Sequence, residues 1–318
     1  MHRSPPSMRR STNGFKRTAR SRVAPLGRLA RLLPPAVMAL LSGCSLEHGF
    51  LHPHGRVAHD ERTLFFEVIA LTLIVVVPVL VGTPWLLWRY RRGKNNNAAY
   101  KPKWTFSWTL EILAWGVPIL IVAVLGVMVW INSHKLDPYR PLPSNQKPLT
   151  VQVIGLDWKW LFIYPDQHVA SVNQLVIPTG RPVHLEMTSD TVMLSLLIPR
   201  LAGQIYAMAG MKTQQWLQAD QPGNFRGENT QYNGFGFQKQ KFRTIAMAPA
   251  SFESWIDKVR ASGQSLDCPT YKQLARPSNV DKPRFYRSVT PGLFSWVIHK
   301  YVLHPAPACG AAANGSHA

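Results

Sequence analysis

The segment VIALTLIVVVPVLVGTPWLLW, residues 68–88, decides the fold because it holds 21 consecutive residues without a charge. A transmembrane helix needs about 20 apolar residues to cross the hydrocarbon core of a bilayer. A second run of this kind, ILAWGVPILIVAVLGVMVWI, covers residues 112–131. Both runs carry tryptophans near their ends, where amphipathic rings favour the membrane interface. The sequence therefore predicts two transmembrane helices, over about 64–88 and 111–131.

The loop between the two runs predicts their orientation. Residues 89–103 contain six basic and no acidic side chains. An excess of Lys and Arg is typical of cytoplasmic loops, so this loop is predicted to be cytoplasmic and both flanks external. We expect residues 63–136 to form a helical hairpin with this topology.

The N-terminal segment is typical of a secreted lipoprotein. Residues 1–31 contain nine basic and no acidic residues, and a short apolar run follows that ends in Leu-Ser-Gly-Cys at Cys44. A basic start, a short apolar core and a small-residue site indicate a secretory signal. The ending resembles the bacterial lipobox, in which the Cys is acylated. We expect a signal peptide over 1–43, lipidation at Cys44 and an external segment over 44–62; a chance Cys after an ordinary signal is the alternative.

The formal net charge of +20 does not indicate nucleic-acid binding. The basic residues concentrate in the N-terminal segment and in the loop, with no basic stripe among aromatics and no nucleic-acid motif. The three cysteines, Cys44, Cys268 and Cys309, fit no zinc motif and are too few for a disulfide framework. Cys268 and Cys309 could pair in an oxidising compartment, but two unpaired thiols are the preferred interpretation.

The segment that follows the second apolar run changes to a β pattern. Residues 149–155, 183–187 and 242–246 alternate apolar and polar side chains, which is typical of half-buried strands. Several short strands separated by turn residues favour a sandwich or barrel over 137–248.

The C-terminal part returns to helical spacing. Residues 250–261 and 292–303 have apolar side chains at helical intervals, so a helical extension is expected over 249–304. Residues 305–318 are small and polar and are expected to be disordered.

Several motifs together resemble the second subunits of haem-copper oxidases. They are LEILAWGVP around Glu111, DWKWLFIYP at 157–165, TVMLSLLIPRLAGQIYAMAGM at 191–211 and GNFRGENTQYNGFGFQKQ at 223–240. YRSVTPGLF, at 286–294, resembles an extension of the quinol-oxidising branch, so the chain is similar to the second subunits of cytochrome bo-type ubiquinol oxidases. The resemblance implies a membrane-anchored two-helix hairpin, a cupredoxin-like β-sandwich or barrel, and a C-terminal helical extension.

The copper ligands of this family are missing from the positions that correspond to them. Leu194 replaces the first histidine, Glu228 and Tyr232 lie in the cysteine stretch, and Phe237 and Gln240 replace the second histidine and the methionine. No Cys, His or Met occurs from 212 to 246. A binuclear copper site needs thiolates and imidazoles, so the sequence predicts no metal in this chain.

Two further residues take their roles from the resemblance. In the family, the glutamate at the position of Glu111 lies at the mouth of a proton-uptake channel of subunit I, so Glu111 is a proton-entry candidate beside a merely structural role. The residue at the position of Trp158 receives electrons from cytochrome c in enzymes that use it. Without copper we prefer a packing role, with Trp158, Trp160, Phe162 and Tyr164 on one face of a strand.

The resemblance also implies a function for the whole chain. The complex would oxidise ubiquinol, reduce oxygen to water and pump protons in the bacterial inner membrane, with the haems, the copper and the quinol site in subunit I. This chain would carry no cofactor and would brace subunit I. Its partners would be subunit I, small membrane subunits and the bilayer, but neither nucleic acid nor cytochrome c; the anchor and β-domain would be periplasmic. A menaquinol-oxidising relative and a membrane-anchored lipoprotein with a binding role are the alternatives, while a cytochrome c oxidase subunit would need the missing ligands.

Overall fold

The computed structural model of this chain describes residues 49–91, 103–261, 263–302 and 308–309. The predicted signal peptide, the lipidation candidate Cys44, most of the loop between the apolar runs and the end of the tail lie outside the described residues.

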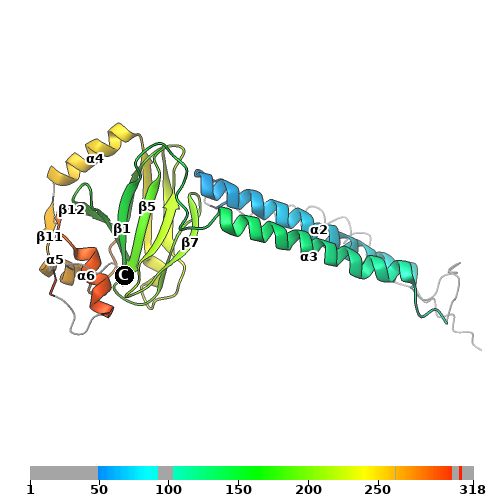
Figure 1. Cartoon of the computed structure of the whole chain (residues 1–318). Helices are drawn as coiled ribbons and strands as arrows, with labels where there is room; N and C mark the ends of the chain where they lie inside the picture. The colour runs from blue at the N-terminus through cyan, green and yellow to red at the C-terminus, as the bar shows by residue number, and fades with distance from the viewer. Residues whose placement is uncertain (1–48, 92–102, 262, 303–307, 310–318) are drawn as a thin grey trace, which may run out of the picture. The chain divides into compact units, whose positions relative to one another are not determined.

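Two long helices carry the apolar runs. α2 spans Arg56–Arg89 and α3 spans Trp108–Lys135, and each is long and apolar enough to cross a membrane. The two helices lie side by side (Figure 1), and Lys135 Nζ on α3 lies 3.1 Å from Asp60 Oδ2 on α2. No residue of α3 is buried, so its apolar side chains are available to lipid or to another subunit. The predicted pair of helices is confirmed.

Twelve strands form the β part of the chain. They are β1 (Leu149–Leu156), β2 (Lys159–Tyr164), β3 (Val169–Val172), β4 (Gln174–Pro178), β5 (Val183–Ser189), β6 (Leu194–Ile198), β7 (Ala202–Ala207), β8 (Thr213–Leu217), β9 (Gly223–Asn229), β10 (Lys241–Met247), β11 (Gln264–Leu266) and β12 (Arg284–Val289). One sheet has the order β11-β12-β3-β2-β1-β5-β8 and the other has the order β4-β10-β9-β6-β7. The strands predicted from alternation are β1, β5 and β10, so the predicted β-sandwich is confirmed.

The main hydrophobic core joins the two sheets. Alternate side chains of β1, such as Leu149, Val151 and Val153, are fully buried and pack in one cluster with Leu196 of β6 and Phe242 of β10. Burial of a large apolar side chain contributes about 1.5–3 kcal/mol, which explains why the alternation is strict where one face meets this core.

The C-terminal extension contains α4 (Pro249–Ala261), α5 (Cys268–Leu274) and α6 (Leu293–Val302), and the helices predicted from spacing are α4 and α6. In this extension, α5 and α6 cover the outer face of the seven-stranded sheet, whereas α4 packs into the main core. β12 pairs antiparallel with β3, and β11 pairs with β12, which adds two strands to the sheet edge (Figure 1). A second core forms where Leu161 and Ile163 of β2 meet Tyr271 and Trp296 of the extension. β2 is therefore buried along its whole length.

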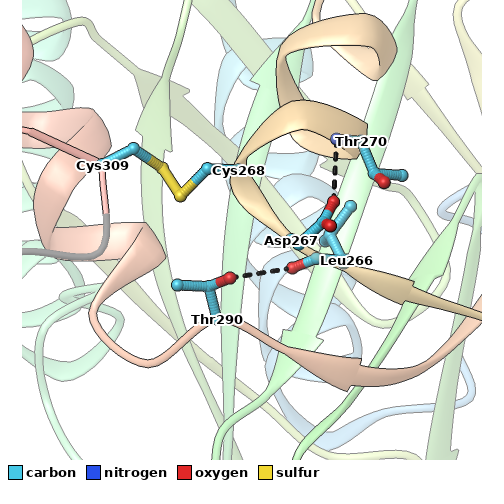
Figure 2. The surroundings of a disulfide bond; sticks show 6 residues. All are labelled: Leu266, Asp267, Cys268, Thr270, Thr290 and Cys309. Atoms are coloured by element: carbon cyan, nitrogen blue, oxygen red, sulfur yellow. Dashed lines mark hydrogen bonds between the residues drawn. A yellow bond between two sulfur atoms is a disulfide. The ribbon is translucent and has the colours of Figure 1, made fainter.

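A disulfide closes the extension. Cys268 at the start of α5 bonds to Cys309 after α6, with Cα atoms 6.0 Å apart (Figure 2). Beside it the carboxylate of Asp267 caps α5 by accepting a 2.9 Å hydrogen bond from the Thr270 N–H. The preferred interpretation of two unpaired thiols is therefore wrong. It failed because the two cysteines are separated by 41 positions in the sequence, and no local pattern shows that they meet.

Candidate functional site

The residues that the sequence predicts at the positions of the lost copper ligands lie on β6, on β9 and on the loop that leads into β10. Leu194 begins β6 and is fully buried, and its side chain fills the space over Gly155, where a Cβ would overlap it. The rings of Tyr232 and Phe237 meet edge to face with centroids 5.6 Å apart. Glu228 pairs with Arg226 on the same strand, and its Oε2 accepts a 2.7 Å hydrogen bond from that side chain.

Gln240 is the centre of a buried amide network. Its side chain is fully buried, and its Nε2 donates to Leu156 O at 3.1 Å. Its Oε1 accepts from Asn229 Nδ2 at 3.0 Å and from Asn233 Nδ2 at 2.8 Å. The side chain of Gln240 thus connects β1, β9 and the loop before β10.

Asn229 extends the network to β6. Its Oδ1 accepts from the backbone N–H groups of Ser195 at 2.9 Å and Gln231 at 3.0 Å. Its Nδ2 also donates to Gln231 O at 2.7 Å. Sequence reasoning did not single out Asn229 or Asn233, because polar residues beside a missing metal site carry no spacing signal of their own.

This donor set does not fit a binuclear copper. The polar side chains at the position are neutral amides whose hydrogen bonds go to one another and to the backbone, and thiolates and imidazoles are the ligands that copper prefers. Among the residues that the structure describes, no group of three or more His, Cys, Asp and Glu side chains could hold a metal ion.

Trp158, in the turn between β1 and β2, contacts the loop that carries Asn233. Leu156 pairs with Lys159, so Asp157 and Trp158 form a two-residue hairpin turn, with Trp158 at φ 64°. Its Nε1 donates to Asn233 O at 3.2 Å, and its ring packs against Gly236 so closely that a Cβ there would overlap it. The prediction that it shares a strand face with Trp160, Phe162 and Tyr164 is therefore wrong for Trp158, because the strand begins after it.

Lys159 ties the site to the C-terminal extension. Its fully buried ammonium donates to Arg276 O at 2.9 Å, Ser278 Oγ at 2.9 Å and Asp157 O at 3.1 Å. Burial lowers the pKa of Lys159 to about 8; nearby Asp157 opposes this shift and Arg284 adds to it. The alternation of β2 gave no sign of a buried lysine, because two of its acceptors, Arg276 and Ser278, lie more than a hundred residues away.

The buried carboxylate of Asp190 forms a second set of contacts with the C-terminal extension. The Asp190 side chain is 1% exposed and accepts hydrogen bonds from Lys300 Nζ at 2.6 Å, Tyr271 OH at 2.7 Å and Tyr301 OH at 3.0 Å. Burial, together with the charge of Asp190, raises the pKa of Tyr271 above its usual range. The extension is therefore anchored beside the loop that leads into β6.

Glu111 lies apart from these residues, in the first turn of α3. Its Oε2 accepts a 3.1 Å hydrogen bond from Trp115 Nε1, one turn further along the helix. It is separated from Lys135, at the other end of the helix, by 24 residues, or roughly 36 Å at 1.5 Å per residue. The structure thus places the proton-entry candidate at the opposite end of α3 from the β domain.

Comparison with known proteins gives consistent matches. Residues 260–304 match the family model described as COX Aromatic Rich Motif. The chain is 46% identical over 286 residues to cytochrome bo(3) ubiquinol oxidase subunit 2 of Pseudomonas aeruginosa, covering 90% of this chain and 84% of the relative. It is 45% identical to ubiquinol oxidase subunit 2 of Acetobacter aceti, covering 87% and 89%.

Among solved structures, the periplasmic domain of subunit II of the cytochrome oxidase of Bradyrhizobium japonicum matches with a TM-score of 0.34 and 22% identity, covering 36% of this chain and 96% of that one. The matches to the two oxidase subunits cover 286 and 278 residues of this chain. The chain therefore belongs to the family of second subunits of bo3-type ubiquinol oxidases, within the haem-copper oxidases.

Proposed function

We propose that this subunit of a ubiquinol oxidase carries no redox centre and braces the haem-bearing subunit I. The observation that carries the proposal is the amide network at Gln240, in which Asn229 and Asn233 use the positions around a former metal site for hydrogen bonds. Electrons then enter the complex from a membrane quinol at subunit I, and the β domain serves as a cap that needs no soluble cytochrome c.

The hairpin supplies the bracing surface. The apolar side chains of α2 and α3 remain largely exposed in this chain alone, including Leu87 and Trp130. Exposed apolar surface of this extent is stable only against lipid or other transmembrane helices. We infer contacts with subunit I, small membrane subunits and the bilayer.

The orientation follows from charge and redox chemistry. The basic loop favours a cytoplasmic connection, which puts the β domain in the periplasm. The disulfide between Cys268 and Cys309 supports this, because disulfides persist in oxidising compartments. An acylated Cys44 would add a lipid anchor on the same side of the inner membrane.

Copper content tests the proposed function. We expect the purified complex to contain only the copper of the haem-copper centre of subunit I, whereas a metal site in this chain would add two copper atoms per complex. Elemental analysis normalised to haem gives the ratio, and extra copper that is lost on Gln240→Leu would contradict the proposal. Quinone extraction from the same preparation separates ubiquinol from menaquinol as reductant.

Glu111 is proposed as a cytoplasmic-side proton-entry carboxylate. We expect Glu111→Ala to slow proton uptake and quinol turnover several-fold in the assembled enzyme, because a carboxylate at a channel mouth supplies protons. Stopped-flow pH measurements on proteoliposomes give both rates. Glu67→Ala, which removes an exposed carboxylate from α2, is the control. Unchanged turnover and pumping in Glu111→Ala would leave Glu111 with a structural role.

A further inference from the structure

Strands β9 and β10 present a cluster of cationic side chains on the outer face of the five-stranded sheet. The register of these antiparallel strands places Arg226 directly opposite Arg243, and Glu228 opposite Lys241. These four side chains point away from the core, since Phe242, between the two cations of β10, is buried. Like charges directly opposite each other on neighbouring strands repel, so the two arginines favour a negative charge between them.

The carboxylates of this surface leave two of the three cations without a partner. Glu228 Oε2 lies 2.7 Å from Arg226 Nη2 and so neutralises that arginine. Lys241 and Arg243 form neither an ion pair nor a side-chain hydrogen bond within the part of the chain that the structure describes. Asp281 lies in the same surface but pairs with neither of them. Lys241 and Arg243 are therefore available to an anionic group from another molecule.

Two cavities adjoin these cations and share two of them. One, of about 390 Å³, extends to the segment before β12 that contains Val280 and Asp281. The other, of about 460 Å³, extends toward Phe237 in the loop between β9 and β10. Arg226 and Lys241 line both cavities, so the two form one groove with the cations at its centre.

The spacing of the cations indicates the form of the occupant. Lys241 and Arg243 are two residues apart on one strand, or roughly 6.6 Å at about 3.3 Å per residue. In an extended peptide, side chains two residues apart point to the same side and have the same spacing. An extended segment with acidic residues at alternate positions would thus present one carboxylate to each cation, and the groove has room for the segment on both sides of them.

We propose that this groove binds an extended acidic segment of a partner protein, in which carboxylates at alternate positions pair with Lys241 and Arg243. The guanidinium of Arg243 can donate two parallel N–H bonds to one carboxylate, which is the strongest geometry for such a pair. The ammonium of Lys241 pairs with the other carboxylate, and Arg226 keeps its bond to Glu228. The proposal concerns a surface of the β domain and does not depend on the absence of copper from this chain.

The test measures binding of synthetic peptides to the intact oxidase complex in mild detergent. The probe is a dye-labelled peptide of alternating glutamate and serine, and its affinity is read from fluorescence anisotropy. We expect Lys241→Gln combined with Arg243→Gln to weaken binding about tenfold, because two exposed ion pairs are lost. Lys258→Gln combined with Arg287→Gln removes the same charges from exposed positions of α4 and β12 and should bind as wild type does.

Two further variants separate a binding site from an effect on folding. Asp281→Asn removes the carboxylate from the wall of the groove and should tighten binding severalfold, because its repulsion of the peptide is lost. Lys241→Glu combined with Arg243→Glu should instead bind a peptide of alternating lysine and serine. Neither gain can come from a domain that fails to fold.

Other outcomes overturn the proposal. They are absence of binding to wild type, and equal affinity of wild type and the double glutamine variant for the alternating peptide. A peptide of the same composition with all its glutamates at one end should bind more weakly, and equal affinity would exclude the extended arrangement. Displacement by inorganic phosphate, at an ionic strength matched with sodium chloride, would indicate a site for free anions instead. The copper ratio is unaffected by these results, so this proposal and the proposed function fail separately.

Discussion

Gln240 stabilises the β domain through buried hydrogen bonds with Leu156 O, Asn229 and Asn233. We expect Gln240→Leu to destabilise the subunit by roughly 2–4 kcal/mol, because Leu156 O and the Asn233 amide would lose a buried partner. Thermal unfolding of the purified complex measures the loss. Gln238→Leu makes the same change at an exposed position two residues earlier and should shift the midpoint little. Equal midpoints for the two variants would mean that the network contributes no stability.

Lys159 makes the stability of the β domain depend on pH. Its folded-state pKa of about 8 lies below the value of about 10.4 in an unfolded chain. Between these values the unfolded state binds the extra proton, so the contribution of Lys159 to stability rises with pH and is lost as pH falls through about 8. We expect the stability difference between wild type and Lys159→Met to shift in favour of wild type from pH 8 to pH 10.

Unfolding midpoints at several pH values measure this slope. Lys241→Met removes an exposed lysine from β10, a strand of the other sheet, and controls for the change of side chain. A difference between wild type and Lys159→Met that stays constant with pH would contradict the prediction. At the residue scale, sequence reasoning singled out Leu194 and Gln240, and both are fully buried in the structure. It could not name Lys159, since burial of its ammonium depends on Arg276 and Ser278, far along the chain.

At the scale of elements, the extension is fixed to the sheet by the β12–β3 pairing and by the disulfide. We expect Cys268→Ser to destabilise the subunit by about 4 kcal/mol, because the loop closed across 41 residues loses its constraint on the unfolded state. Thermal unfolding with and without reductant measures the effect. Reductant should lower the midpoint of wild type toward that of the variant and leave the variant unchanged; a variant as stable as oxidised wild type would contradict the prediction.

Helices and strands could be predicted from the sequence where they bury only one face, because that face alone sets the spacing of the apolar side chains. The alternation of β10 and of the first half of β1 and the helical spacing of α4 predicted these elements, because each buries one face in the main core and leaves the other face partly exposed. α5, β11 and β12 were not predicted. These elements are short, at seven, three and six residues. They form by packing on the outer face of the seven-stranded sheet, and no local sequence pattern shows that this face is buried.

At the scale of the whole molecule, the testable property is topology. We expect Lys258→Cys on α4 to react with a membrane-impermeant maleimide in intact spheroplasts, and Lys103→Cys to react only after permeabilisation, because the basic loop favours the cytoplasm. Both positions are exposed in the structure, so accessibility after permeabilisation is the control. Labelling of Lys103→Cys in intact spheroplasts would reverse the proposed orientation.

The sequence by itself determined the two apolar helices, the β-sandwich and the family. These follow from runs of side chains and from motifs that are local, because helix length and strand alternation depend on near neighbours. The tertiary structure decided the contacts between distant segments: the amide network at Gln240, the buried ammonium of Lys159, the carboxylate of Asp190 and the disulfide. Each depends on groups far apart in the chain, and their energies arise only when folding removes them from water and places their partners within hydrogen-bonding distance.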